Sequence, residues 1–327
     1  MASRLSIAIE DGHVVLPEGQ LLVLGATVES DLSPLEPARA MVLSRYADAH
    51  AQANAAGYGA VTAIDGQFDG AVVFVPRARD AARALLRFAR QRTSGPIIVD
   101  GPKTNGVDAL FKACRARADV SDAFAKAHGK TFTVTAGDFS DWPDMASTKA
   151  EDGWWRGPGA FSADGIDRAS QCLVDALPEQ LAGHVVDLGA GWGFLSRAIA
   201  GRDGVAALDV VEIDHLALDA ARRNVSDDRA TFHWADARTW RPGTPVDHVV
   251  TNPPFHTSRK AEPELGRAFI RAAAAMLKPK GSLWLVANRH LPYERTLEDA
   301  FHFVQTLTPN PSFKIFHAKS PKKLPRG

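Results

Sequence analysis

The sequence is poor in cysteine and carries no net charge. Its 327 residues include only two cysteines, Cys114 and Cys172, which lie far apart and outside any C-x-x-C unit. This argues against a disulfide framework and against a cysteine zinc site. Lysine plus arginine and aspartate plus glutamate number 38 each, which argues against a protein that coats nucleic acid non-specifically. A local basic patch could still meet a phosphate backbone, so net charge does not identify the partner.

Long apolar runs are also missing. No segment approaches the ~18 apolar residues of a membrane span. The first apolar stretch, residues 5–9, is broken by Glu10 and Asp11 before it could form the core of a signal peptide. The 11 histidines contain no H-x-x-x-H pair and no cluster at metal-ligand spacing. We therefore expect a cytoplasmic monomer that binds neither a membrane nor a metal.

The pattern of the chain predicts an α/β protein with a mostly parallel sheet, because short β-branched runs alternate with alanine-rich helical stretches. The alternation occurs twice, on either side of a stretch rich in Asp, Gly, Pro and Trp at residues 139–159. We expect an N-terminal domain at 1–145, a second domain at 146–319 and a short basic tail at 320–327. The expected strands are 21–24, 71–75, 96–99, 185–188, 206–211, 231–234, 246–251 and 282–287, and the expected helices are 79–90, one opened by Gly106, 194–200, 216–224 and 267–277.

A glycine turn in the second half is the first candidate site. The run 185–194 (VVDLGAGWGF) is an apolar strand that leads into a turn and then a helix, with Asp187 followed by Gly189, Gly191 and Gly193. Glycine lets backbone amides approach a ligand, and the helix N-terminus adds partial positive charge. The third glycine of a dinucleotide fingerprint would fall at Phe194. This departure, together with Asp187, favours a nucleotide-like cofactor without a pyrophosphate.

Acidic residues follow the next two strands. Glu212 ends an apolar strand, where a carboxylate can accept hydrogen bonds from both ribose hydroxyls, whereas Asp214 is better suited to cap the next helix. Asp236 follows the strand at 231–234, and its carboxylate could accept from an exocyclic adenine amine while the backbone N–H of Ala237 donates to a ring nitrogen. A surface-turn aspartate would look the same at position 236.

The segment that decides the chemistry is Asn252, Pro253, Pro254 and Phe255, directly after the strand at 246–251. Two prolines remove two backbone donors and fix φ, so the Asn252 side chain and the Pro253 carbonyl can form a rigid set of acceptors beside a stacking ring. Such a set can hold a planar amine. An Asn-Pro-Pro sequence also makes a good turn, but its position at a strand end about 65 residues after the glycine run favours a site.

The order of these motifs resembles the S-adenosylmethionine-dependent methyltransferases that modify planar exocyclic nitrogens. The resemblance is closest to the bacterial ribosomal RNA small-subunit guanine-N2 methyltransferases. It rests on the motifs above and on flanking segments at 158–167 (PGAFSADGID), His256, 286–293 (VANRHLPY) and 313–316 (FKIF). It is good over about 157–318 and faint before that.

The resemblance implies two tandem Rossmann-like methyltransferase lobes, of which only the second binds S-adenosylmethionine. The N-terminal lobe would be degenerate: residues 23–27 (VLGAT) lack the glycine run, and 74–77 (FVPR) stand in place of the Asn-Pro-Pro segment. That lobe would stabilise the other or contact RNA. The implied substrate is a guanine amine in ribosomal RNA, with the RNA or the small subunit as partner. Asn252 and Pro253 would hold the amine, and His256 would be a proton relay or a structural residue.

Three alternatives remain open from the sequence. The same acceptors could hold another planar amine, in large-subunit RNA, in DNA adenine or in a protein glutamine. A non-catalytic RNA-binding assembly factor is a second alternative, which the motifs of the second half oppose. A nicotinamide oxidoreductase is a third, disfavoured by Phe194 and the two prolines.

Overall fold

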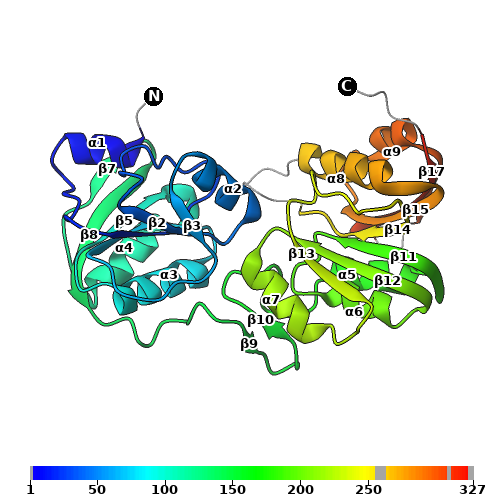
Figure 1. Ribbon diagram of the computed structural model, residues 1–327, viewed down its shortest axis with the longest axis horizontal. Helices are drawn as coiled ribbons and strands as arrows, with labels where there is room; N and C mark the ends of the chain where they lie inside the picture. The colour runs from blue at the N-terminus through cyan, green and yellow to red at the C-terminus, as the bar shows by residue number, and fades with distance from the viewer. Residues whose placement is uncertain (1–2, 255–262, 308–310, 323–327) are drawn as a thin grey trace. The chain divides into compact units, whose positions relative to one another are not determined.

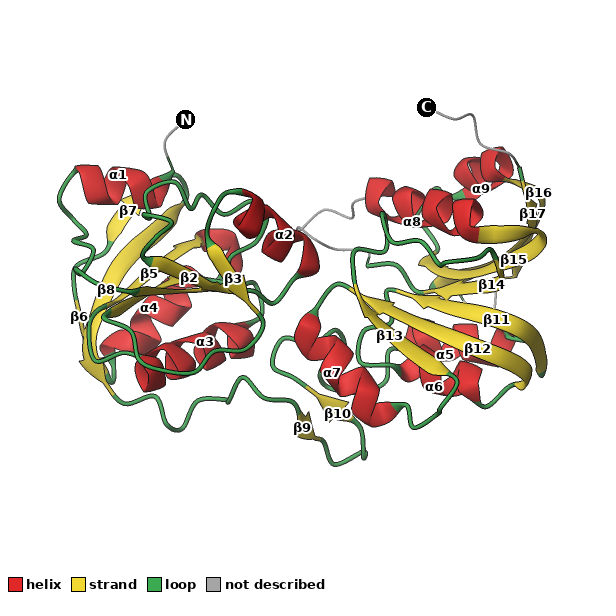
Figure 2. Ribbon diagram, viewed as in Figure 1, coloured by secondary structure: helices red, strands yellow, loops and turns green. Residues whose placement is uncertain are grey.

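A computed structural model describes residues 3–254, 263–307 and 311–322 of the chain. The chain forms two compact units (Figure 1). The N-terminal unit comprises Met1–Ser147 and Gly157–Gly159, and the C-terminal unit comprises Thr148–Arg156 and Ala160–Gly327. Each unit has its own sheet with helices on both faces (Figure 2).

The sheet of the N-terminal unit has the strand order β3-β2-β1-β4-β5-β8-β6, and β7 pairs with β8. Strands β1 to β5 are parallel, whereas β8 runs antiparallel to β5 and β6 antiparallel to β8. Its central strands read as continuous apolar runs because both of their faces are covered. The strands are β1 (Leu21–Leu24), β2 (Ala40–Leu43), β3 (Gly59–Val61), β4 (Gly70–Phe74), β5 (Ile97–Pro102), β6 (Ala118–Val120), β7 (Phe124–Lys126) and β8 (Gly129–Gly137).

The helices of this unit cover the two faces in pairs. Helices α3 and α4 pack on the face that carries Leu22 and Leu24, and α1 and α2 pack on the face that carries Leu21 and Val23. The helices are α1 (Arg4–Glu10), α2 (Ala47–Ala55), α3 (Arg79–Arg92) and α4 (Val107–Arg115), with a short 3-10 turn η1 (Lys103–Asn105) before α4.

The sheet of the C-terminal unit repeats this order as β13-β12-β11-β14-β15-β17-β16. Strands β11 to β15 are parallel, and β17 is antiparallel to both β15 and β16. The strands are β11 (Gln180–Leu188), β12 (Asp203–Glu212), β13 (Ala230–Trp234), β14 (Val246–Thr251), β15 (Leu277–Asn288), β16 (Phe301–Leu307) and β17 (Phe313–Pro321). A separate two-stranded ribbon is formed by β9 (Thr148–Lys149) and β10 (Trp155–Arg156).

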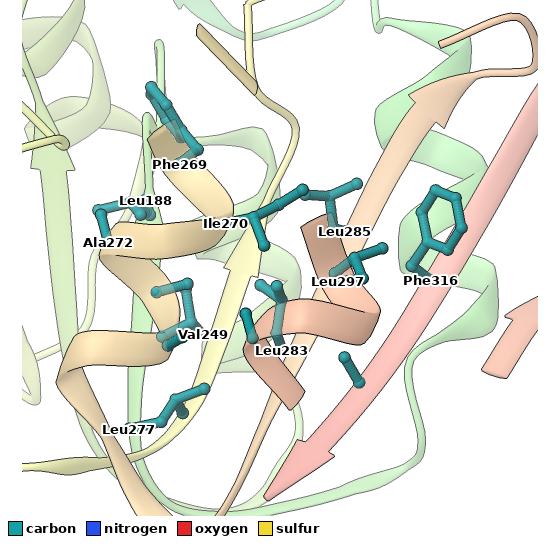
Figure 3. Packing of buried hydrophobic residues seen from close by; sticks show 14 of the residues in the cluster. Leu188, Val249, Phe269, Ile270, Ala272, Leu277, Leu283, Leu285, Leu297 and Phe316 are labelled. Atoms are coloured by element: carbon teal, nitrogen blue, oxygen red, sulfur yellow. The ribbon is translucent and has the colours of Figure 1, made fainter. Parts of the chain in front are cut away.

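Two hydrophobic clusters hold the helices to this sheet. Helices α8 and α9 cover one face, where Phe269 and Ile270 of α8 meet Leu188, Val249 and Leu285 (Figure 3). Helices α5, α6 and α7 cover the other face (Figure 1). The helices are α5 (Arg168–Ala176), α6 (Phe194–Ala200), α7 (His215–Asn224), α8 (Pro263–Met276) and α9 (Glu294–Ala300).

The two units therefore share one plan, which confirms the predicted α/β class with two tandem Rossmann-like lobes. By position in the strand order and by face, α1, α2, α3 and α4 correspond to α5, α7, α8 and α9. Helix α6 is the exception, because residues 25–39 between β1 and β2 form turns and no helix. The N-terminal unit thus lacks the helix that follows the first strand of the C-terminal unit.

Candidate active site

The predicted site residues gather at one end of the C-terminal sheet. Strand β11 lies between β12 and β14, and all three are parallel, so their carboxyl ends meet at the same edge. Asp187 is on β11, Glu212 ends β12, and Asn252 follows β14. The chain reverses its direction of strand addition between β11 and β14, and open α/β sheets bind ligands outside the strand ends at such a point.

The glycine turn after β11 combines close packing with open backbone. Gly189, Gly191 and Gly193 all have positive φ, at 79°, 57° and 91°. A Cβ on Gly189 would lie 2.9 Å from Cε1 of Phe269, so this residue must be small for α8 to pack against the turn. A Cβ on Gly191 would meet no atom of the described residues within 4 Å. The backbone at Gly191 is therefore the part of the turn that a ligand could approach.

Glu212 is tied to this turn. Its Oε2 accepts a hydrogen bond from the backbone N–H of Gly191 at 2.7 Å, and its Oε1 accepts from the N–H of Asp214 at 2.9 Å. Burial raises the pKa of the Glu212 carboxyl to about 7, and the nearby Asp214 charge acts in the same direction. Each carboxylate oxygen has a second lone pair for a ligand hydroxyl. Asp214 itself caps α7 by accepting from Leu216 and Ala217, as the sequence predicted.

Asp187 is the most buried charged group of the site. Its side chain is inaccessible to solvent, and its Oδ2 accepts a hydrogen bond from Oγ of Ser196 in α6 at 2.5 Å. Its Oδ1 is buried and has no hydrogen-bond partner in the described part of the chain. Burial raises the pKa of Asp187 to about 7, and the charge of Glu212 adds to this rise. A cation bound beside Oδ1 would relieve both the missing contact and the cost of ionisation.

The carboxamide of Asn252 is held on one side only. Its Nδ2 donates to Oδ2 of Asp167 at 2.9 Å and to Oγ of Ser170 at 2.8 Å. Its Oδ1 is buried and has no hydrogen-bond partner within the described ranges. Both amide hydrogens are thus used within the protein, and the acceptor oxygen is left for something else.

The ends of β14 and β11 are bonded to each other. Thr251 is completely buried, and its Oγ1 donates to the carbonyl of Leu188 at 2.6 Å, which ties Asn252 to the residue before the glycine turn. Pro253 is buried and Pro254 is exposed. The predicted stacking residue Phe255 and the predicted relay His256 lie outside the described residues.

The predicted adenine contact is placed in a tight turn. Both carboxylate oxygens of Asp236 accept from the guanidinium of Arg238, and Oδ1 also accepts from the backbone N–H of Arg238 at 2.8 Å. Ala237 is buried beside it. The structure therefore gives Asp236 a local turn role, and its contact with adenine remains a prediction.

Sequence reasoning did not identify four side chains that support these groups: Asp167, Ser170, Ser196 and Thr251. Asp167 could have been recognised as a helix cap, because an Asp directly before an apolar-periodic segment is a signal for a helix N-terminus. Its bond to Asn252 spans 85 positions and has no local signal. Among the described residues no group of three or more His, Cys, Asp or Glu could hold a metal ion. No helix in the described ranges is long and apolar enough to cross a membrane.

Comparison with known proteins gives consistent relatives. Ribosomal RNA small subunit methyltransferase C of Hahella chejuensis is 28% identical over 274 residues, with 78% of each chain covered. The protein of the same name from Pseudomonas putida strain KT2440 is 27% identical over 316 residues, with 92% of this chain and 95% of the relative covered. Among solved structures, the T. thermophilus 16S rRNA N2 G1207 methyltransferase (RsmC) in complex with AdoMet and guanosine matches with a TM-score of 0.79 and 26% identity, covering 94% of this chain and 90% of the other.

The fold and the site together define a methyltransferase of the doubly wound α/β class. The family described as methyltransferase small domain matches residues 154–317, half of the chain, which include the glycine turn and the Asn-Pro-Pro segment. The chain belongs to this family.

Proposed function

We propose that this protein transfers a methyl group from S-adenosylmethionine to the exocyclic amine of a guanine in ribosomal RNA, with the 16S RNA of the small subunit as the substrate. The observation that carries the proposal is the pairing of two features on adjacent strand ends. A glycine turn beside the buried carboxylates of Asp187 and Glu212 follows β11. The fixed amide of Asn252 follows β14, and its Oδ1 has no hydrogen-bond partner among the described residues. A cofactor and a base amine would meet between them.

The residues after β11 and β12 fit S-adenosylmethionine. When bound, this cofactor supplies an electrophilic methyl group on a sulfonium centre. Asp187, whose buried Oδ1 has no hydrogen-bond partner in the part of the chain that the structure describes, suits the positive charge of its amino-acid portion. The open backbone at Gly191 and the carboxylate of Glu212 suit a ribose, and Asp236 with Ala237 would contact the adenine.

Asn252 and Pro253 would orient the substrate amine. The nitrogen of a guanine amine is a poor nucleophile because its lone pair is delocalised into the ring. Acceptors at Asn252 Oδ1 and the Pro253 carbonyl would hold its two hydrogens and direct the nitrogen, so that much of the rate would come from positioning. The proton would leave to solvent or through His256. An internal guanine must leave its stack, which costs a few kcal/mol and favours an accessible RNA segment.

The identity of the RNA rests on the relatives. The two curated relatives above are named small subunit methyltransferases, and the solved relative holds a guanosine. We expect the protein to act in the cytoplasm, as a monomer, on 16S RNA or on the small subunit. Size-exclusion chromatography with light scattering would test the monomer.

The first experiment is methyl incorporation from radiolabelled S-adenosylmethionine. Small subunits, large subunits, naked 16S RNA, DNA and protein extract should be compared, and the labelled nucleotide should be mapped. Label at the N2 position of one guanine in 16S RNA is expected. Label in DNA adenine or in protein glutamine would refute the RNA assignment and leave the amine site, whereas no label in any acceptor would refute the methyltransferase proposal.

The Asn252→Ala variant tests the site itself. Loss of the acceptor oxygen should nearly abolish methyl transfer, whereas calorimetric binding of S-adenosylmethionine should stay near wild type. The Glu212→Ala variant should instead weaken cofactor binding. Retained turnover in Asn252→Ala, or an unchanged dissociation constant in Glu212→Ala, would remove the corresponding assignment.

We propose that the N-terminal unit binds no cofactor and that it stabilises the catalytic unit or contacts RNA. Residues 25–39, between β1 and β2, form turns and no helix, and they include one glycine, Gly25, whereas the turn after β11 has three. The carbonyl oxygen of Val75, directly after β4, is already used within the protein, because it accepts a hydrogen bond from Nδ2 of Asn105 at 2.7 Å. Calorimetry of the full chain should give one S-adenosylmethionine per molecule, and a second equivalent would contradict this proposal.

A further inference from the structure

The two groups that hold Asn252 come from the start of α5. Asp167 is the N-cap of this helix, and its Oδ2 accepts both from the backbone N–H of Ser170 at 2.8 Å and from Nδ2 of Asn252. Ser170 is buried, and its Oγ is the second acceptor for Nδ2. Helix α5 is itself anchored in the core through Ala169 and Leu173. The support for Asn252 is therefore formed before any substrate arrives.

The chemistry of Asp167 fixes which way round the carboxamide lies. An ionised carboxylate can only accept hydrogen bonds, so it must face the NH₂ group of Asn252 and not its oxygen. If the carboxamide flipped, Oδ1 would face the Asp167 carboxylate and two acceptors would repel each other. The NH₂ group would then occupy the place of the acceptor and would repel the hydrogens of a substrate amine. Without these anchors, an isolated asparagine could adopt either orientation.

We propose that Asp167 and Ser170 are positioning residues that set the hydrogen-bonding polarity of Asn252 so that its Oδ1 accepts from the substrate amine. This inference rests on the proposed function and deepens it. The buried Oδ1 without a partner among the described residues is the structural sign of this arrangement, because a buried acceptor is costly unless a donor completes it. A charge-assisted bond to Nδ2 also polarises the amide and strengthens its oxygen as an acceptor. The polarity favours a substrate that presents N–H over one that presents a carbonyl.

Substitutions of Asp167 and Ser170 can separate the positioning of Asn252 from the capping of α5. Asp167→Asn keeps an oxygen of the same reach, and the cap bond from the backbone N–H of Ser170 would hold that oxygen toward Asn252. Asp167→Ser keeps a good N-cap but is too short to reach Asn252. Ser170→Ala removes the second acceptor and leaves the backbone N–H for the cap. Gln171→Ala, which removes only an exposed bond to Asp175 on the same helix, is the control.

Kinetics give the first readout. We expect kcat to fall about 10- to 100-fold in Asp167→Ser/Ser170→Ala, equivalent to about 1.4 to 2.8 kcal/mol at about 1.4 kcal/mol per tenfold. The dissociation constant for S-adenosylmethionine should stay near wild type, whereas the melting temperature should fall by a few degrees, because the amide hydrogens of Asn252 lose both of their acceptors. Asp167→Asn should retain kcat within about threefold. Wild-type kcat in the double variant, or an equal loss in Asp167→Asn, would overturn the inference.

A second readout does not depend on activity. The side-chain amide protons of Asn252, assigned by their absence in Asn252→Ala, should exchange slowly with water in the wild type and in Asp167→Asn. They should exchange at least tenfold faster in Asp167→Ser/Ser170→Ala. Unchanged exchange would refute the anchoring even if no substrate were methylated, whereas an inactive wild type with the expected exchange pattern would contradict only the proposed function.

Discussion

The buried carboxylate of Asp187 makes the stability of the C-terminal unit depend on pH in a direction that can be calculated. Its pKa in the folded protein is raised from 3.8 to about 7, first by burial and then by the charge of Glu212. A carboxyl with a raised pKa favours the folded state fully below pH 4, and this contribution is lost as the pH rises through 7. Holding Asp187 ionised in the fold costs about 4 kcal/mol, at about 1.4 kcal/mol per pH unit.

The Asp187→Asn variant removes this titration with little change of shape. The new side chain can keep an oxygen for the hydroxyl of Ser196. It places NH₂ at the position of Oδ1, which has no hydrogen-bond partner among the residues that the structure describes. An amide NH₂ group without an acceptor there lowers the free energy of unfolding by about 1–3 kcal/mol at every pH. The free energy of unfolding of the wild type, relative to the variant, should therefore fall by about 2 kcal/mol between pH 5.5 and pH 7.5. In that range the folded wild type still binds a proton at Asp187 that its unfolded chain has already released, whereas residue 187 of the variant does not titrate.

Denaturant unfolding of the cofactor-free protein, followed by tryptophan fluorescence, measures this difference. Trp142 is the one tryptophan in the N-terminal unit and the other six lie in the C-terminal unit, so the signal mainly reports the unit that contains Asp187. Asp175→Asn, at an exposed position on α5, is the control and should show no such change with pH. A difference between wild type and Asp187→Asn that is constant within about 0.5 kcal/mol across this range would refute the reasoning.

The same ionisation should govern cofactor binding. If Asp187 pairs with the cationic portion of S-adenosylmethionine, binding to the wild type should be tighter at pH 7.5 than at pH 5.5, because the ionised form is the competent one. Asp187→Asn should bind more weakly at both values and with less pH dependence. Calorimetry at the two pH values is the measurement, and a pH dependence that persists unchanged in the variant would exclude Asp187 as its origin.

Three further predictions concern the packing around the site. Thr251→Val keeps the shape of the side chain but removes the donor to the buried carbonyl of Leu188, so denaturant unfolding should show a loss of about 1–3 kcal/mol; an unchanged midpoint would contradict this. Gly266→Ala in α8 would place a Cβ 1.9 Å from Oη of Tyr293 and should destabilise by about 1–3 kcal/mol. Tyr293→Phe removes a buried hydroxyl with no hydrogen-bond partner in the described ranges and should be neutral or stabilising, whereas a loss above about 1 kcal/mol would reveal a partner for the hydroxyl.

The central parallel strands, and the helices that follow a glycine turn or a capping residue, were predictable from local sequence. The helix Phe194–Ala200 and the strand Val246–Thr251 have the expected limits, because the glycine turn before the helix and the Asn-Pro-Pro turn after the strand are local signals. Strand β16 was not predicted. It lies at the edge of the sheet and alternates irregularly between buried and exposed positions, so its structure depends on pairing with β17.

The components of the site were predictable individually, but their connections were not. Residue type and spacing identified Asp187, Glu212 and Asn252 as candidates. The bond from Asn252 to Asp167 depends on how α5 packs against the sheet, and the bond from Thr251 to Leu188 depends on strand register. Such contacts join residues that are 85 and 63 positions apart. No periodicity or turn rule encodes them, because they arise only once the core is assembled.

The two units offer an internal test of how one fold keeps or loses a site. Their sheets have the same strand order, but the turn after the first strand has one glycine, Gly25, in the N-terminal unit and three, Gly189, Gly191 and Gly193, in the C-terminal unit. Gly25→Ala would force a Cβ against the carbonyl oxygen of Phe74 at 2.2 Å and should lower stability by about 1–3 kcal/mol without changing the affinity for S-adenosylmethionine. In Gly191→Ala the added Cβ meets no described atom within 4 Å, so the loss of stability should be only about 1–2 kcal/mol, from the left-handed backbone conformation. The added methyl group would lie where the ligand approaches and should weaken binding at least tenfold. Thermal unfolding and calorimetry of both variants measure the two effects, and equal losses of affinity would mean that the turn after β11 is no more a ligand site than its counterpart after β1.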